Sequence, residues 1–317
     1  MGCMRRSAAL LPIMLLVMAP MASAQPAPAI ETVIVTGSKY HYGVTPNAIA
    51  HDFVRTFTAP SLLLNEIARW HMGICPRTDG LSTAALNAYV TARIREVAAQ
   101  VGAPLAPEPC KSNLEILFTD RPQEALDIVR SSSPSILGYH PSPIVSHAIQ
   151  AWYMTGTTDI NGKSVVDHDV SGTITYDDGQ AFLNGPGGKA IAGKMSVDGI
   201  PGARIQGFKG RPEVTSDIMG ELIIADRNKI SALQLGPVAN YVAMLALTRT
   251  QDFEDCQLMP SITNLFSADC DDKQKPAQVS PSDIAYLRGV YKMDSGATLQ
   301  VQRDQIAAEM QKALGGQ

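Results

Sequence analysis

The stretch Leu235-Gly-Pro-Val-Ala-Asn-Tyr-Val-Ala-Met-Leu-Ala-Leu-Thr248 determines how the rest of this chain is interpreted. Pro237 suits the first turn of a helix, because its fixed φ is helical and its missing N–H is not needed there. The residues that follow are apolar at three- and four-residue spacings and on the remaining faces too. A helix that is apolar nearly all round must be nearly all buried. We therefore predict a buried central helix that carries no evident catalytic group.

Segments with clear local signals lie on both sides of this helix. Residues 218–225 are a β-prone apolar run that predicts a strand, and residues 226–229 are typical of a turn. Downstream, a short segment over 260–265 precedes residues 279–291, which predict a final helix.

This order of segments resembles that of the zincin-like metallopeptidases, and of the matrixins in particular. Ser280-Pro-Ser-Asp-Ile-Ala-Tyr-Leu-Arg-Gly-Val-Tyr291 is similar to their closing helix, Thr-Pro-x-Asp-Ile-x-x-Leu-x-x-Leu-Tyr. Residues 260–263 stand where the methionine turn of that family lies, with Thr263 in place of methionine. The resemblance covers roughly the last third of the chain. It implies an α+β fold with a zincin-like mixed sheet and packed helices, and an unrelated α+β domain is the alternative.

The catalytic groups of that family are missing at the matching positions. The resemblance puts Asn240 and Met244 at metal-binding positions, Tyr241 at the catalytic glutamate and Thr250 at the third ligand. Zinc hydrolysis needs imidazole or carboxylate ligands and a carboxylate that takes the proton of water. The aligned side chains supply none of these, and all six histidines lie at or before His168. We therefore expect no catalytic residue, no bound metal and no cofactor.

The N-terminus has the pattern of a secretory signal peptide over residues 1–24. Arg5 and Arg6 precede an apolar run from Ala8 to about Met21, and small residues follow at 22–24. We expect a periplasmic or secreted protein with no transmembrane segment after cleavage. Removing two of the 26 basic residues leaves 24 against 30 acidic ones, a formal charge of −6. That balance argues against nucleic acid as a partner, because binding to phosphates needs a basic surface.

Four cysteines remain after cleavage, and they allow three pairings. An oxidising compartment favours disulfides. The short spacing between Cys256 and Cys270 favours one bridge there, which leaves Cys75 with Cys110. A zinc site of four cysteines is the alternative, but the chain has no Cys-x-x-Cys spacing.

We divide the mature chain into four parts: a leader over 25–45, an α/β half over 46–155, a Gly-rich insertion over 156–215 and the zincin-like half over 216–317. The α/β half predicts alternating helices and strands. Its helices are expected after Thr45 and over 83–100 and 122–130, and its strands around 67–71 and over 113–118 and 149–154. In the helix over 83–100, an inward apolar stripe is expected at Leu86, Tyr89, Val90, Ile94, Val97 and Ala98.

The Gly-rich insertion holds 12 of the 25 glycines and several Asn-Gly and Asp-Gly turn signals. These features predict loosely ordered hairpins or a loop. Asp167, His168 and Asp169 could ligate a metal, but adjacent residues of a strand point to alternate faces, so an exposed turn is the better interpretation.

Two further resemblances bear on function. Arg69-Trp70, Cys110-Lys-Ser-Asn113 and the closing helix are similar to an uncharacterised secreted proteobacterial family with a degenerate zincin-like C-terminal region, which implies no activity. Val33-Ile-Val-Thr-Gly37 is similar to a segment near the mature start of TonB-dependent receptors. We therefore expect a non-catalytic binding or interaction module whose partner, such as a cell-envelope protein, is unknown. The alternatives are a hydrolase with a site of dispersed residues and an accessory to TonB-linked uptake.

Overall fold

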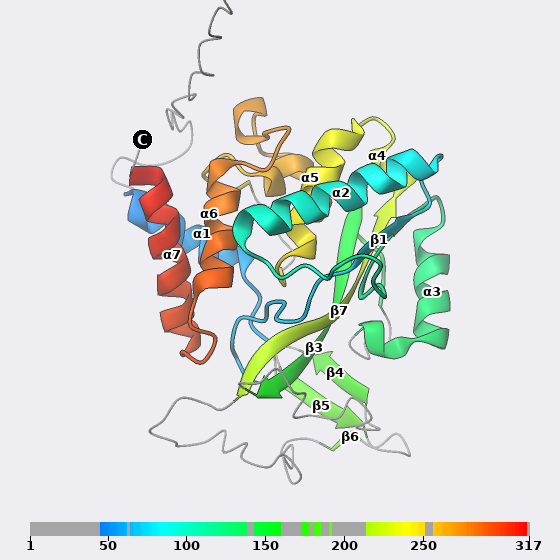
Figure 1. The fold of residues 1–317 in the computed structure, drawn as a ribbon, viewed down its shortest axis with the longest axis horizontal. Helices are drawn as coiled ribbons and strands as arrows, with labels where there is room; N and C mark the ends of the chain where they lie inside the picture. The colour runs from blue at the N-terminus through cyan, green and yellow to red at the C-terminus, as the bar shows by residue number, and fades with distance from the viewer. Residues whose placement is uncertain are drawn as a thin grey trace, which may run out of the picture. The chain divides into compact units, whose positions relative to one another are not determined.

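The computed structural model describes residues 45–61, 64–137, 143–159, 173–177, 180–184, 190–191, 214–250 and 256–315. They form an α+β fold on a mixed four-stranded sheet of order β1-β2-β7-β3, as the sequence predicts (Figure 1). The strands are β1 (Pro76–Asp79), β2 (Leu114–Thr119), β7 (Val214–Asp226) and β3 (Ile149–Asp159). The first three run parallel, and β3 pairs antiparallel with β7 at one edge.

The sheet carries a hydrophobic cluster on each face, because successive side chains of a strand point to opposite sides. The smaller cluster joins the sheet to α3 (Pro122–Ser132) and to the 3-10 turn η1 (Pro134–Leu137). Its buried members are Leu126, Leu137, Trp152, Leu222 and Ile224. The larger cluster covers the other face, where Ile223 and Ala225 of β7 pack with α2 (Ala84–Val101) and α5 (Leu235–Ala246).

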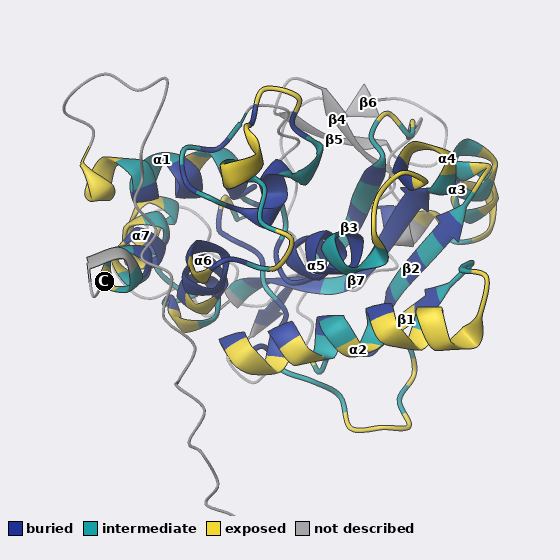
Figure 2. Cartoon of the chain, turned by 90° about the horizontal axis from the view of Figure 1, so that it is seen from above, coloured by how far each residue is buried: buried dark blue, intermediate teal, exposed yellow. Residues whose placement is uncertain are grey.

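Helix α5 is the central helix that the sequence predicts. Pro237 lies in its first turn, and every residue from Val238 to Ala246 is buried. Figure 2 shows α5 in dark blue, enclosed by other elements, whereas α2 has an exposed outer face. A charged side chain would be costly in a helix with no solvent-facing side, and α5 contains none.

Three other helices begin at side-chain caps, and one of them ends at a glycine. Thr45 caps α1 (Pro46–Phe57) by accepting a hydrogen bond from the N–H of Ala48. Thr83 caps α2 in the same way, and Gly102 ends it in a left-handed conformation with φ of 80°. Ser280 and Asp283 form a capping box at the start of α6 (Pro281–Lys292).

Several short elements lie outside the main sheet and its long helices. They are the strands β4 (Thr173–Asp177), β5 (Gln180–Asn184) and β6 (Ala190–Ile191) of a small antiparallel sheet, helix α4 (Arg227–Ile230), and the 3-10 turns η2 (Ile262–Phe266) and η3 (Asp272–Gln274). Helix α7 (Leu299–Gly315) packs against α6 and α1.

Several sequence predictions need correction. The segment over 67–71 is no strand: Ile67 and Arg69 make only isolated bridges, to Pro60 and Asp217. Residues 226–229 are no simple turn, because the Asp226 side chain caps α4. Leu86 and Tyr89 are 38% and 47% exposed, so the inward stripe of α2 begins at Val90. Strand β1 and helix α7 were not predicted.

Some predicted segments lie outside the residues that the structure describes. They are the signal peptide, the leader apart from Thr45, Val33–Gly37, Asp167–Asp169 and most of the Gly-rich insertion. Strands β3 and β7 remain paired as far as Asp159 and Val214, so the main sheet extends into the range that we assigned to that insertion. Among the helices that the structure places, none combines the length and the hydropathy needed to cross a bilayer.

Candidate ligand-binding site

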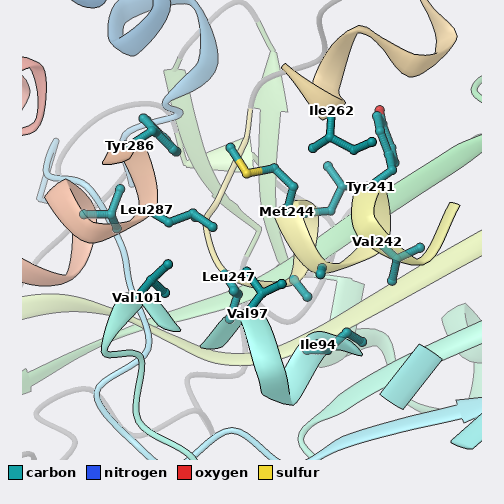
Figure 3. Packing of buried hydrophobic residues seen from close by; sticks show 14 of the residues in the cluster. Ile94, Val97, Val101, Tyr241, Val242, Met244, Leu247, Ile262, Tyr286 and Leu287 are labelled. Atoms are coloured by element: carbon teal, nitrogen blue, oxygen red, sulfur yellow. The ribbon is translucent and has the colours of Figure 1, made fainter. Parts of the chain in front are cut away.

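The four positions that the resemblance assigns to the degenerate metal site do not converge on one cavity. Met244 is fully buried and lies between Ile262 and Tyr286 in the core (Figure 3). Tyr241 packs edge-on against Phe266, with ring centroids 4.8 Å apart. Thr250 lies 3.4 Å from the Tyr153 hydroxyl. Of the four positions, Asn240 alone lines the pocket described next.

This pocket lies between α2 and α5 and has a volume of about 330 Å³. Its residues come from three segments that are distant in sequence: α2, α5 and the loop before α6. They are Tyr89, Ala92, Arg93, Glu96, Asn240 and Gln278. The lining combines a guanidinium, a carboxylate, two carboxamides and a phenol, and polar groups of this kind fix a ligand's orientation in small-molecule sites.

Asn240 holds this arrangement together although it is almost wholly buried. Its Nδ2 donates to the carbonyl oxygens of Gly236 at 2.8 Å and Ala277 at 3.1 Å. These two bonds leave its Oδ1 as the acceptor for Arg93 Nε, at 2.6 Å. Because a buried amide is costly unless its groups are paired, Asn240 has one favourable orientation, and it positions Arg93.

Arg93 also pairs with Glu96 on the next turn of α2, with 2.6 Å between Nη1 and the nearer carboxylate oxygen. The Arg93 side chain is 18% exposed and that of Glu96 is 66% exposed. Within the described ranges, Arg93 Nη2 makes no hydrogen bond to the protein, so its N–H groups are available. The site therefore has a guanidinium that Asn240 holds in place, next to a carboxylate that is mostly exposed to solvent.

Tyr89 forms the apolar side of the pocket. A Cβ added at Gly236 would lie 3.7 Å from the Tyr89 hydroxyl, which places this ring beside the first turn of α5. Leu86 precedes Tyr89 by one turn on the same helix face and is also exposed. An apolar patch thus continues from the charged pair along α2.

Sequence reasoning missed the residues of α2 that build this pocket. It gave Arg93 and Glu96 no role and placed Tyr89 in the inward apolar stripe of α2. A usable signal was present, because residues 89, 92, 93 and 96 are three or four apart and so share one helix face. What the spacing could not reveal is the partner Asn240, which is 147 positions from Arg93 along the chain.

A second polar cluster lies at the C-terminal end of α5. The hydroxyls of Tyr153 and Tyr291 donate to the carbonyls of Leu245 and Leu247 at 3.3 and 2.7 Å. Trp70 Nε1 donates to the carbonyl of Ala246 at 2.9 Å. Three aromatic side chains from separate segments therefore satisfy the carbonyls that a helix end leaves unpaired.

Glu221 of β7 lies next to these tyrosines and opposite Tyr153 in the sheet register. Its side chain is 1% exposed, and neither carboxyl oxygen has a hydrogen-bond partner among the residues placed by the structure. Burial raises the pKa of Glu221 well above its ordinary value of 4.5. Burial also raises the pKa of Tyr153 and of Tyr291, and the charge of Glu221 raises both further.

One His–Asp pair has the composition of a catalytic dyad, but both nitrogens of its imidazole already have hydrogen-bond partners. His71 Nδ1 bonds to Asp217, whose second oxygen accepts from the Thr158 hydroxyl. The other ring nitrogen, Nε2, accepts a hydrogen bond from Arg69 Nε at 3.1 Å. Arg69 in turn donates to three carbonyls near the end of α6. The nitrogen that a general base would use is therefore occupied, and the pair braces the fold.

Both predicted disulfides are present, between Cys75 and Cys110 and between Cys256 and Cys270. The first joins the residue before β1 to the loop before β2. No group of three or more His, Cys, Asp or Glu side chains within the described segments is arranged to hold a metal ion.

Comparison of the chain with family models, curated proteins and solved structures gives no match.

Proposed function

We propose that this protein is an extracytoplasmic binding module that holds a small ligand in the α2–α5 pocket, on a metallopeptidase-like scaffold without the catalytic groups. The observation that carries the proposal is the position of Asn240. The resemblance puts this residue at a metal-ligand position, and here its amide orients the pocket's guanidinium.

The scaffold part of the proposal is supported by the order of elements. An antiparallel edge strand, β3, lies beside β7, and β7 is followed by α5, the turn η2 and the capped helix α6. The resemblance implies the order strand, helix, turn and final helix, but it puts the strand over 218–225 at the sheet edge, whereas β7 has a neighbour on each side. The extracytoplasmic part is supported by the signal-peptide pattern and by two disulfides, which persist in oxidising compartments.

The binding part is supported by the chemistry of the pocket. Its groups are hydrogen-bond donors and acceptors held by a buried amide. Among the lining residues, none is a nucleophile paired with a base, as covalent catalysis requires. A preformed site of this size and polarity suits reversible binding of a small polar molecule.

A thermal-shift screen with a library of small polar metabolites tests the proposal. Ala92 is exposed and lines the pocket, so Ala92→Trp should fill it. Ala99→Trp is the matched control, because Ala99 is exposed on the same helix and outside the pocket. A ligand at about 100 times its Kd should stabilise the wild type and the control by about 2.7 kcal/mol. It should leave Ala92→Trp unchanged.

Two results would argue against this function. If no library compound stabilises the wild type, the pocket is not a small-molecule site. If the purified protein hydrolyses unfolded casein and Ala92→Trp does so equally, the hydrolase alternative gains and its site lies elsewhere.

A further inference from the structure

We infer that the α2–α5 pocket selects free α-amino acids with an apolar side chain, through the opposite charges of Arg93 and Glu96. This inference rests on the proposed function, because it names the ligand class of the same pocket.

The opposite signs of the two charges favour a zwitterionic ligand. Arg93 and Glu96 are three residues apart on α2, and their charged groups are in direct contact. A ligand with only a negative charge is attracted by Arg93 and repelled by Glu96, and a simple cation meets the reverse. A zwitterion is attracted by both, because its carboxylate can face Arg93 while its ammonium faces Glu96. An α-amino acid carries these two groups on one carbon, which matches the short separation of the pair.

Arg93 and Glu96 differ in how firmly the protein holds them. Asn240 fixes Arg93 through Nε, which leaves Nη2 to donate to a carboxylate. Hydrogen bonds between a guanidinium and a carboxylate are among the strongest that proteins make. Glu96 is mostly exposed, so its side chain can turn towards an ammonium group. Water can replace Arg93 as the partner of this exposed carboxylate, so Glu96 can turn away from the guanidinium.

The pocket also has an apolar side. Tyr89 lines the pocket, and both it and Leu86 leave a large part of their side chains exposed on the same face. An aromatic or branched side chain on the ligand would cover this surface, and aromatic pairs gain energy beyond the area they bury. The volume of about 330 Å³ is at the small end of ligand sites, which span roughly 300–1,000 Å³. A single amino acid therefore suits the pocket better than a long peptide.

Isothermal titration calorimetry with matched probes tests the inference. The probes are L-phenylalanine, N-acetyl-L-phenylalanine without the ammonium, L-phenylalaninamide without the carboxylate, and glycyl-L-phenylalanine with the two charges separated. We expect L-phenylalanine to bind and each blocked form to bind about tenfold more weakly or worse, since each loses a charge-assisted hydrogen bond. The dipeptide should also bind more weakly, which separates free amino acids from peptide termini as the source of the ligand.

Two variants assign the charges. In Arg93→Gln, L-phenylalanine should lose its advantage over the amide, and in Glu96→Gln it should lose its advantage over the N-acetyl form. Arg121→Gln and Glu124→Gln are controls, because Arg121, the N-cap of α3, and Glu124 form an i,i+3 pair at 2.8 Å away from the pocket. Both controls should bind L-phenylalanine as the wild type does.

The outcomes separate this inference from the proposed function. If library compounds bind in the pocket but L-phenylalanine does not, the amino-acid inference is wrong and the binding module stands. Equal binding of L-phenylalanine and either blocked form would also overturn the inference, as would tighter binding of the dipeptide. If nothing binds the wild type, the proposed function fails as well.

Discussion

At the residue scale, Glu221 is the least expected side chain of the sheet, because its carboxyl is buried in strand β7. A buried carboxyl with no hydrogen-bond partner in the described structure cannot remain charged without a large cost. Burial therefore raises the pKa of Glu221, so the folded chain keeps this proton above the pH at which a free carboxyl releases it. An acid within an apolar strand is visible in the sequence, but the register beside Tyr153 is not.

We predict that Glu221 makes the stability of the protein fall as pH rises. Below about pH 4.5 both the folded and the unfolded chain carry this proton, so the group has no effect on the free energy of unfolding. Above that pH the unfolded chain releases the proton while the folded chain keeps it, until the raised folded pKa is reached. Stability should therefore fall by about 1.4 kcal/mol per pH unit relative to Glu221→Gln.

Urea unfolding of the wild type and Glu221→Gln at several pH values between 5 and 8 checks this. Glu66, whose pKa burial raises to about 7, has the same sign of effect between pH 4.5 and 7. Its contribution is common to both proteins and cancels in their difference. A difference that stays constant across the range would contradict the prediction.

At the scale of elements, α5 is a structural helix whose sides are all in contact with other segments. Met244 lies in the core near Ile262 and Tyr286 (Figure 3). Helices α6 and α7 pack even more closely, since a Cβ added at Gly289 would lie 2.8 Å from the Ile306 Cα. At these contacts the backbone positions are set by the volume of single side chains.

We predict that Met244→Ala lowers the free energy of unfolding by about 2–5 kcal/mol, because it leaves a cavity in a closed core. Tyr241→Phe keeps the ring contact with Phe266 and should cost no more than about 1.5 kcal/mol. Thermal and urea unfolding of both variants would measure the two costs. A Met244→Ala melt equal to that of the wild type would show that this side chain is not packed.

We also predict that Gly289→Ala destabilises the protein. The added methyl group meets the backbone of α7, and overpacking of this kind costs about 1–3 kcal/mol. The clash is with backbone, which puts the cost in the upper part of that range, so the gain in helix propensity of about 1 kcal/mol offsets only part of it. Arg288→Ala, at an exposed neighbouring position, should change the stability by about 0.5 kcal/mol or less. Equal melting temperatures for the two variants would refute the close approach of α6 and α7.

At the scale of the whole described fold, long-range bonds join segments that are distant in sequence. Gln302 of α7 accepts a hydrogen bond from the Ile67 N–H at 2.8 Å, and α7 also packs on α1. The two disulfides close loops with sequence separations of 35 and 14 residues. These links hold the ends of long loops together, and the disulfides do so in the unfolded chain as well, where they reduce its conformational entropy.

We predict that Cys256→Ser/Cys270→Ser costs about 3 kcal/mol and that Cys75→Ser/Cys110→Ser costs about 4 kcal/mol, because the longer loop loses more entropy when it closes. Urea unfolding of the two double variants checks the order. Peptide mapping of the non-reduced protein checks the pairing, and four free thiols would rule out both bridges.

The sequence by itself determined the features that depend on neighbouring residues. Pro237 and the apolar faces specify α5, Thr45, Thr83 and Ser280 specify helix starts, and Gly102 specifies a helix end. The spacing of the cysteines was enough for both pairings. In each case the physical cause acts over one or two helical turns or through a short loop, so one stretch of chain contains the whole signal.

The tertiary structure decided which surfaces are covered and which side chains meet. Leu86 and Tyr89 continue the apolar period of α2, yet the fold leaves them exposed beside the pocket. Helix α7 has a weak pattern of its own, and its buried Gln302 pairs with the Ile67 N–H and with the Ser295 carbonyl. The contact of Arg93 with Asn240 exists because β7 and α5 bring distant segments together. Burial and pairing depend on the whole fold, so residue spacing alone cannot specify them.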